Sequence, residues 1–379
     1  MIEIFQGAAV QPPTNVPQGE IAMSANHESV VIVSLDPDAP EATPGRILDL
    51  LHMPTEPDQR VRWHTKGLVT VRSDSADNAL VANLRDIPGV SRVVCVPHGR
   101  RLSSRTEGRP RQAVNIGGGV LIGDGRTSVM AGPCSLESKD QILKSAEIVA
   151  ENGGQALRGP VYKPRSSPYQ FGGYGEKGLE YLALARERTG LRIVTEVLEI
   201  RQVEILAQSV DVIQIGARNM SNFPLLFAAG ANSTGIPVLL KRGLSASISE
   251  FLDAAEYVML GRHSANHMEP GLILCERGIR THAPALRFTL DVGAIPILKD
   301  RTFLPVIADP SHAAGERFLV PALARAALAA GADGLIVEVH PEPDLAWSDA
   351  KQTLDAAGFA AMMGDIHRYA HVEATAQYL

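Results

Sequence analysis

Short apolar runs alternate with amphipathic segments along most of the chain, and the spacing becomes regular from Ser128 onward. Two of the amphipathic segments, 139–153 and 317–331, end at a glycine, as helices commonly do. Eight apolar runs have the length of strands; they span 128–133, 156–161, 192–197, 212–217, 237–243, 272–278, 305–310 and 335–340. Eight strand–helix pairs over about 250 residues predict an α/β fold of the (β/α)₈ or TIM barrel type, and a doubly wound open sheet is the structural alternative.

The pattern before the barrel is different. Its elements follow the order strand, helix, strand, strand, helix, strand; they span 30–35, 45–51, 61–65, 68–73, 76–86 and 91–97. This β-α-β-β-α-β order is the ferredoxin-like split unit, which also serves as a regulatory module for small ligands. We therefore expect a small ferredoxin-like regulatory domain over 29–97.

Three further segments complete the predicted organisation. Residues 1–28 are rich in Pro, Gln, Ala and Asn without periodicity, which indicates a flexible tail. Residues 98–113 contain several arginines among Gly, Ser and Pro, which favours a solvated linker. The barrel domain is expected over 114–379, beginning with a short hairpin at 114–123 that has three glycines at its turn.

Charge and composition narrow the function classes. A net charge of −6 on 379 residues argues against nucleic acid as a partner. No apolar run reaches 18 residues and the N-terminus lacks the pattern of a secretory signal, so we expect a cytoplasmic protein without a membrane partner. Its cysteines, Cys95, Cys134 and Cys275, are too few for a disulfide framework, and their odd number fits reduced thiols.

Residues capable of chemistry gather where the predicted strands end. Active sites of (β/α)₈ barrels lie at the C-terminal ends of the strands. In strand order, the side chains at these ends are Cys134, Arg158 with Lys163, Glu196, Arg218, Lys241, Arg277, His312 and Glu338. The seventh, eighth and first strands are neighbours in a closed barrel, so His312, Glu338, Asp349 and Cys134 can converge on one point.

One thiol, one imidazole and two carboxylates make a mixed soft and hard donor set. Such a set suits a catalytic divalent ion, and Mn, Fe, Co and Zn all remain open. Taken singly, Cys134 can also be a small buried hydrophobe and His312 a hydrogen-bonded core histidine. Cys275 lies one layer deeper on its strand than Arg277, and we interpret it as a core residue.

Cations form the second part of the predicted site. They lie at or just beyond the strand ends, and no equal number of acids is near them in the sequence; they are Arg158, Lys163, Arg165, Arg218, Lys241 and Arg277. Because unpaired buried cations are costly, we expect more than one anionic group to bind there.

These residues carry a resemblance to a known family. The segments AGPCSLES, KPRSSPYQFGGYGEKGLEYL, DVIQIGARNMSNFPLL, CERGIRT, DPSH and EVHPEPDLAWSDAKQ resemble 3-deoxy-D-arabino-heptulosonate 7-phosphate (DAHP) synthase over about residues 114–370. The preceding β-α-β-β-α-β stretch resembles the ACT-like N-terminal extension of the type Iβ-like branch. The resemblance implies a metal-dependent, aldol-type condensation of phosphoenolpyruvate with erythrose 4-phosphate and water, which gives DAHP and phosphate in the first step of the shikimate pathway.

The resemblance also implies roles for the matching positions. The ligands of one divalent metal ion, with Mn²⁺ expected before Fe²⁺, Co²⁺ or Zn²⁺, would be Cys134, His312, Glu338 and Asp349. Phosphoenolpyruvate would be bound by Arg158, Lys163, Arg218, Lys241 and Arg277, with Glu196 near its reacting carbons. Arg165 and Ser166 would hold the phosphate of erythrose 4-phosphate, and Asp349 would also face the substrates. The catalytic residues implied are Lys163, Glu196, Cys134 and His312.

Some positions depart from the family pattern. Ser166 stands where threonine is usual, and Pro160 and Ala350 stand where glycine is common. These changes leave open a paralogue that uses another aldose phosphate in secondary metabolism. A catalytically silent regulatory subunit is a further alternative. A sister class that uses arabinose 5-phosphate is disfavoured by KPRSSP, since that class typically has an Asn-containing segment there.

Regulation and assembly are expected only by resemblance. His64 resembles a histidine that contacts an aromatic amino acid in regulated relatives, although Lys66 replaces a small hydroxyl residue. Tyrosine or phenylalanine is therefore the expected inhibitor, and a module for oligomer contacts is the alternative. Relatives with the extension are generally tetrameric, so a homotetramer is expected.

Overall fold

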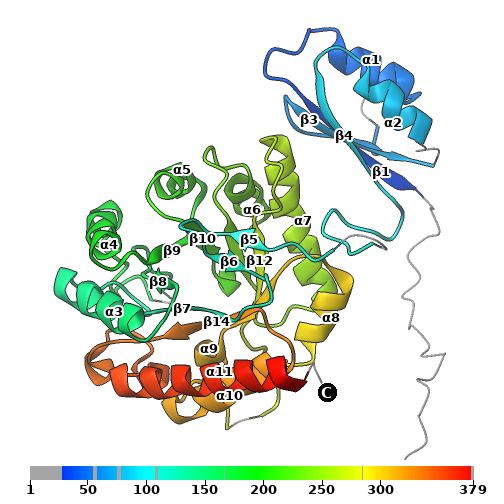
Figure 1. The fold of residues 1–379 in the computed structure, drawn as a ribbon. Coiled ribbons are helices and arrows are strands. Elements are labelled where there is room, and N and C mark those ends of the chain that lie inside the picture. The colour runs from blue at the N-terminus through cyan, green and yellow to red at the C-terminus, as the bar shows by residue number, and fades with distance from the viewer. Residues whose placement is uncertain are drawn as a thin grey trace, which may run out of the picture.

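The structure is a computed structural model that describes residues 28–53, 58–74, 78–106, 110–165, 167–283 and 285–376, with side chains described as far as residue 366. The predicted tail, 1–28, lies outside this part of the chain except for Glu28. Figure 1 shows two units, a barrel ringed by helices and a smaller sheet with its own two helices.

Eight parallel strands form a closed barrel, as the apolar runs predict. They are β7 (Ser128–Gly132), β8 (Ala156–Arg158), β9 (Arg192–Val197), β10 (Val212–Ile215), β11 (Val238–Lys241), β12 (Leu272–Glu276), β13 (Val306–Ala308) and β14 (Gly334–Glu338). Neighbours follow chain order, and β14 pairs with β7 to close the ring. The doubly wound alternative is therefore wrong. Strand β8 ends before the predicted 161, because Pro160 has no N–H with which to continue the ladder.

The helices that connect these strands surround the barrel (Figure 1). They are α3 (Lys139–Glu151), α4 (Glu176–Thr189), α5 (Val203–Ala207), α6 (Phe223–Gly230), α7 (Ile248–Ser264), α8 (Ala294–Arg301), α9 (Pro310–Ala314), α10 (Val320–Ala329) and α11 (Ala356–Ala376). Short 3₁₀ turns lie at Ile200–Gln202, Ala217–Asn219, Arg317–Leu319, Pro343–Leu345 and Ala350–Gln352. The predicted helix 317–331 is thus a 3₁₀ turn followed by α10, which has a proline in its first turn, a position where the missing N–H has no helical partner to lose.

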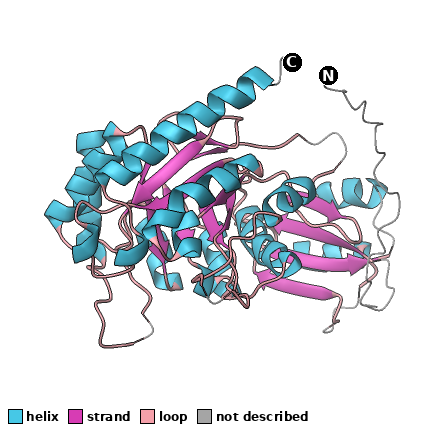
Figure 2. Ribbon diagram, turned by 90° about the horizontal axis from the view of Figure 1, so that it is seen from below, coloured by secondary structure: helices cyan, strands magenta, loops and turns pink. Residues whose placement is uncertain are grey.

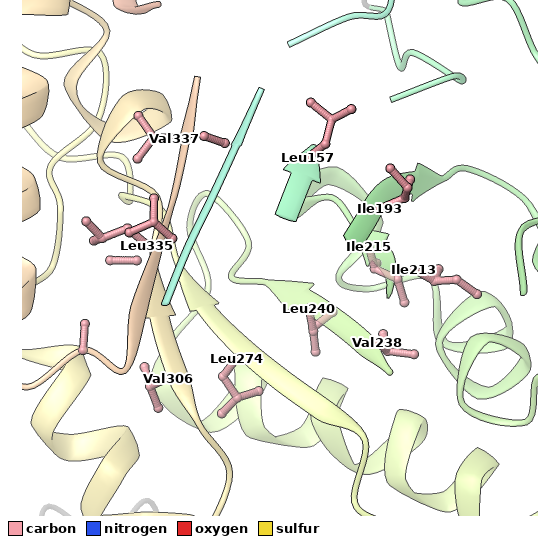
Figure 3. Packing of buried hydrophobic residues seen from close by; sticks show 14 of the residues in the cluster. Leu157, Ile193, Ile213, Ile215, Val238, Leu240, Leu274, Val306, Leu335 and Val337 are labelled. Atoms are coloured by element: carbon pink, nitrogen blue, oxygen red, sulfur yellow. The ribbon is translucent and has the colours of Figure 1, made fainter. Parts of the chain in front are cut away.

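Alternate strand residues face opposite sides of the barrel wall. Val238 and Leu240 belong to the large core between strands and helices, whereas Leu239 belongs to a smaller core inside the barrel. Figure 3 shows the outer set, including Leu157, Ile215 and Val337, on the strands. Side chains alternate between the two faces because the strand is pleated. A parallel sheet that is covered on both faces therefore needs apolar side chains on each of them.

A short hairpin contributes to the interior core. Its strands β5 (Val114–Asn115) and β6 (Leu121–Ile122) pair antiparallel, as predicted for 114–123. Gly117 to Gly119 all have positive φ, which is why glycines occupy this turn. Ile116 and Ile122 pack with the inward-facing strand residues, among them the fully buried Cys275. The interpretation of Cys275 as a core residue is confirmed.

The small unit contains a four-stranded antiparallel sheet in the order β2-β3-β1-β4. Figure 2 shows its strands in magenta beside cyan helices. Its elements are β1 (Ser29–Leu35), α1 (Thr43–Leu50), β2 (Val61–Thr65), β3 (Leu68–Ser73), α2 (Asn78–Arg85) and β4 (Val90–Val96). This is the predicted β-α-β-β-α-β order. Val31 and Val33 pack with the two helices, and Ile32 on the opposite face packs with Phe227 and Leu260 of the barrel unit.

The arginine-rich segment that follows β4 is held on the barrel. The Glu256 carboxylate on α7 accepts hydrogen bonds from the backbone N–H groups of Leu102 and Ser103 and from the Ser103 hydroxyl, at 2.8–3.0 Å. Ser103 is fully buried. The start of the predicted linker is therefore packed against the barrel, which limits how the small sheet can move.

None of the described helices is both long and apolar enough to cross a bilayer.

Candidate active site

The C-terminal ends of the barrel strands surround a polar cavity of about 180 Å³. Nine of the predicted site residues line it: Arg158, Lys163, Arg165, Glu196, Arg218, Lys241, Arg277, His312 and Asp349. Cys134 and Glu338 are buried beside it. Ser166 lies outside the described residues, so its predicted place is not tested.

Four donor atoms meet at one side of this cavity. They belong to Cys134, His312, Glu338 and Asp349, and they lie within 4.8 Å of one another. Nε2 of His312 is 3.2 Å from Oε1 of Glu338, and Sγ of Cys134 is 2.9 Å from Oδ2 of Asp349. Among the described residues this is the cluster whose donors fit a divalent ion, with a thiol and an imidazole for softer metals and two carboxylates for harder ones.

His312 is held in one orientation by Asp309, which the sequence analysis did not select. The Asp309 carboxylate caps α9 by accepting from the backbone N–H of His312 at 2.9 Å, and it lies 2.8 Å from His312 Nδ1. It also forms a buried ion pair with Lys241. Burial alone would oppose ionisation of Asp309, but the charges of His312 and Lys241 outweigh it and hold the pKa well below its usual value. Nδ1 is thereby occupied, and Nε2 is the nitrogen left for a metal ion.

Charged side chains surround the Cys134 thiol. Burial and the nearby Glu338 carboxylate raise the pKa of its thiol to about 12. The thiol donates to Asp349, and Nζ of Lys163 approaches Sγ at 2.6 Å and donates to the Cys134 carbonyl at 2.8 Å. Without a metal the sulfur therefore keeps its proton. A bound cation would favour the thiolate, which is the form that ligates metals.

Asp349 adopts a left-handed backbone conformation, with φ 54° and ψ 30°. Such a conformation is uncommon outside glycine, although aspartate tolerates it better than most residues. Arg287 Nη1 holds its side chain at 2.7 Å from Oδ1, and Thr353 donates to its carbonyl. Arg287, which the sequence analysis also missed, thus fixes a carboxylate of the donor cluster.

Two of the six predicted cations have carboxylate partners, contrary to the expectation that these cations are unpaired. Arg158, only 2% exposed, lies 3.0 Å from Glu338, and Lys241 pairs with Asp309. The sequence could not show this, because Glu338 is far from Arg158 in the chain and Asp309 was not counted. No carboxylate partner is found in the described residues for Lys163, Arg165, Arg218 or Arg277. The cavity therefore keeps an excess of positive charge.

Glu196 is the carboxylate of the cavity lining that has no cation partner within the described part of the chain. Its Oε2 accepts from Gln214 Nε2 at 3.3 Å on the neighbouring strand β10. Gly216 makes room for it, because a Cβ at that position would lie 2.0 Å from Oε1 of Glu196. A carboxylate placed in this way can accept a proton.

An aromatic ring contacts two arginines of the cavity lining. The Arg277 guanidinium carbon lies 4.4 Å from the centre of the Phe288 ring, and that of Arg287 lies 5.7 Å from it. Both distances are within the range of cation–π attraction. Phe288 thus holds a predicted substrate-binding arginine and the arginine that fixes Asp349.

His64, the predicted effector contact, is not among the residues that line the strand-end cavity. On β2, its Nε2 lies 2.9 Å from the Thr70 hydroxyl, and its ring stacks on Phe227 of α6 at 6.3 Å. Burial, with the nearby Arg62, lowers the pKa of His64 to about 4. It is therefore a neutral ring between the small sheet and the barrel.

Comparison with known proteins agrees with this geometry. The model of the DAHP synthetase I family matches residues 105–370. The phospho-2-dehydro-3-deoxyheptonate aldolase of Thermotoga maritima is 47% identical over 281 residues, which is 74% of this chain and 80% of that protein. The 2-dehydro-3-deoxyphosphooctonate aldolase of Caulobacter vibrioides is 33% identical over 272 residues, or 67% of this chain and 91% of that protein.

Solved structures of DAHP synthase are also similar to this chain. The crystal structure of the Thermotoga maritima phospho-2-dehydro-3-deoxyheptonate aldolase (DAHP synthase) superposes with a TM-score of 0.68 at 40% identity, covering 91% of this chain and 98% of that one. A truncated form of the Thermotoga maritima synthase gives 0.64 at 44% identity, covering 72% and 96%. The chain belongs to the DAHP synthetase I family.

Proposed function

We propose that the strand-end cavity condenses phosphoenolpyruvate with erythrose 4-phosphate and water, and that the residues described above divide this work. The observation that carries the proposal is the placement of a four-donor cluster beside a cationic cavity at one end of the barrel. Both substrates are phosphates, and a cavity with surplus cations suits them.

The donor cluster fits one divalent ion, held by Cys134, His312, Glu338 and Asp349. When bound, that ion would supply Lewis-acid polarisation of the aldehyde oxygen. We favour Mn²⁺ by resemblance to the family, and Fe²⁺, Co²⁺ and Zn²⁺ are alternatives because the donor set accepts all four. Arg158 and Gln352 secure Glu338 through contacts at 3.0 Å and 2.5 Å, and Asp309 orients His312.

The cations hold phosphoenolpyruvate so that its C3 carbon faces the aldehyde. Arg277 and Lys241 are almost fully buried, and Arg218 and Lys163 line the same cavity. Their charges neutralise the phosphate and the carboxylate of this substrate, and their fixed positions supply orientation without reorganisation during the reaction.

Glu196 is proposed to act on water. As C3 of phosphoenolpyruvate bonds to the aldehyde carbon, the aldehyde oxygen takes up a proton and C2 becomes electron-poor. Water adds to C2 and gives one proton to a base, which balances the proton taken up by the aldehyde oxygen. The second proton of the water leaves as the C2–O bond to phosphate breaks, so that C2 becomes a ketone and inorganic phosphate carries that proton away. Glu196 suits the base because it borders the cavity and has no cation partner in the described residues.

The aldose phosphate is assigned to the outer part of the cavity. Arg165 lies there, with its guanidinium anchored by the backbone carbonyls of Phe171 and Trp347 at 3.0 Å and 3.3 Å. Donors remain on this guanidinium for a phosphate. Ser166, the next residue, is proposed as its partner.

Phosphate release tests the proposal. The protein is incubated with phosphoenolpyruvate and erythrose 4-phosphate, then treated with EDTA and finally given Mn²⁺. We expect release that stops with EDTA and returns with the metal. Absence of release with every metal tried would contradict the proposal and favour a silent regulatory subunit.

A different aldose is the second candidate function. Relatives named 2-dehydro-3-deoxyphosphooctonate aldolase match at 33% identity, and Pro160 and Ala350 depart from the glycines that are common in the family at these positions. Replacing erythrose 4-phosphate by arabinose 5-phosphate in the same assay separates the two. Faster release with the pentose phosphate would keep the chemistry and change the substrate.

Regulation and assembly are also proposed. We infer that tyrosine or phenylalanine inhibits through the small sheet, that the enzyme is a homotetramer and that it acts in the cytoplasm. The supports are the ferredoxin-like topology and the fixed contact of the sheet with the barrel through His64 and Phe227. Activity measured with each amino acid, and mass determined by light scattering, test the first two points.

A further inference from the structure

A second basic cavity lies where the small sheet meets the barrel. It has a volume of about 340 Å³ and is bordered by β4, the segment that follows it, and the end of α7 with the adjoining loop. Its basic and imidazole side chains are Arg92, Arg100, Arg101, Arg262, His263 and His267. In the described lining the one carboxylate is Glu269, which is exposed. None of these residues belongs to the strand-end cavity.

Arg262 brings a positive charge into the wall of this cavity without an ion pair. It is 3% exposed, and its guanidinium donates to the backbone carbonyls of Gly235, Ile236 and Glu269 at 3.0–3.2 Å. These acceptors are neutral, and burial lowers the pKa of Arg262 to about 10. A buried cation whose hydrogen-bond acceptors are all neutral favours an anion nearby.

His263, the next residue, has an unused nitrogen. It is 3% exposed, and its Nε2 is buried without a hydrogen-bond partner in the described part of the chain. Buried polar atoms of this kind are uncommon, since leaving one unpaired costs free energy. A ligand oxygen in the cavity would supply the missing partner.

Arg92 and Arg100 are only weakly engaged. Arg92 donates to the His267 carbonyl at 3.4 Å, and Arg100 donates to the Arg105 carbonyl at the same distance. Arg101, in contrast, is bound by Asp253 and Ser249 at 2.8 Å and 3.0 Å. The cavity thus has two guanidinium groups whose donors are largely free for a ligand.

The remaining wall is apolar. Val94 and Val96 of β4 face the same cavity as Met259 of α7 and Pro270 of the adjoining loop. An inorganic ion would leave these side chains against water, whereas a ligand with an apolar body would cover them.

We propose that this cavity binds a small organic anion, with its carboxylate or phosphate group against Arg92 and His263 and its apolar body against Val96 and Met259. Because β4 and α7 belong to the two different units, the bound anion connects the small sheet with the barrel. The site stands on its own residues and does not depend on the proposed reaction.

Fluorine NMR of the full chain tests this site, and the variants below separate it from the strand-end cavity. The probes are 4-fluorobenzoate, 4-fluorophenyl phosphate and the neutral 4-fluorobenzamide. We expect at least one anion to bind about tenfold more tightly than the amide. Binding of the benzoate alone assigns a carboxylate site, and binding of the phosphate alone assigns a phosphate site.

Variants locate the binding. Arg92→Gln and His263→Leu should each weaken the preferred anion about tenfold, whereas Arg62→Gln, an exposed arginine on β2 outside the cavity, should not. Circular dichroism confirms folding, and if His263→Leu does not fold, Arg92→Gln alone decides. Equal binding of anion and amide, no anion binding at millimolar concentration, or unchanged binding by Arg92→Gln would overturn the proposal.

Discussion

The two ends of the barrel interior are built from opposite kinds of residues. At the C-terminal ends of the strands the interior is lined by cations, two carboxylates and an imidazole around a polar cavity. Deeper in the barrel the same inward-facing positions are apolar, and the hairpin residues Ile116 and Ile122 pack among them. Strand β12 shows the change within three residues, from Cys275 in the core to Arg277 in the cavity.

The two ends of the barrel interior therefore have different roles: the polar end serves the reaction and the apolar end serves stability. Substitutions at the polar end should change turnover with little loss of stability, because those residues are held for function. Substitutions at the apolar end should do the reverse, since tight packing there contributes to folding. Each prediction below tests this separation.

The largest effect is expected for Lys163→Ala. The variant removes a cation that approaches Cys134 and lines the cavity, so kcat/KM should fall about 10²–10³-fold while the melting temperature stays near that of the parent. Lys144→Ala, which removes an exposed lysine on α3, is the matched control. Retained activity in Lys163→Ala would contradict the role assigned to this lysine.

Asp309→Asn is expected to lower both stability and metal binding, so it is the exception to this separation. It leaves buried Lys241 without its carboxylate and weakens the orientation of His312. We expect a loss of about 3–5 kcal/mol in unfolding free energy and about 10–100-fold weaker metal binding. Urea unfolding and metal titration measure the two, and normal metal affinity would show that His312 needs no such support.

Ile122→Ala should lower stability alone. The side chain is fully buried inside the barrel, and its truncation should cost about 2–4 kcal/mol. Because the cavity is at the other end of the strands, kcat/KM at 25 °C should remain within about twofold of the parent. A large loss of activity in protein that is still folded would contradict the separation.

The smallest effect is expected for Phe288→Leu. Leucine keeps apolar bulk but removes the ring beside Arg277 and Arg287, which contributes about 0.5–1 kcal/mol at such sites. We expect KM for phosphoenolpyruvate to rise about two- to fivefold, with kcat nearly unchanged. An unchanged KM would show that the arginines are positioned without the ring.

The barrel and the donor cluster were predictable from local patterns. Apolar runs such as 212–217 and 335–340 identify strands whether or not their partners are known, and the barrel then places residues that follow neighbouring strands together. Asp309 could also have been found, because an aspartate before a proline and a helical segment is a typical N-cap.

Other contacts depend on where distant segments meet. Arg287 lies in the loop after β12 without any periodic pattern, and its contact with Asp349 joins residues 62 positions apart. The binding of Leu102 and Ser103 by Glu256 is longer in range still, so the composition of 98–113 favoured a solvated linker. Sequence patterns predict the elements, whereas these contacts follow from the path of loops.

A comparison of two buried cysteines tests the central claim most directly. Cys134 lies in the donor cluster and Cys275 in the interior core, and both are buried. Each is changed to serine, and the parent and both variants are titrated with Co²⁺ while thiolate-to-cobalt charge-transfer absorption is recorded. We predict that this absorption and tight cobalt binding are lost in Cys134→Ser and kept in Cys275→Ser. Their persistence in Cys134→Ser would show that the metal does not bind at the strand-end cluster.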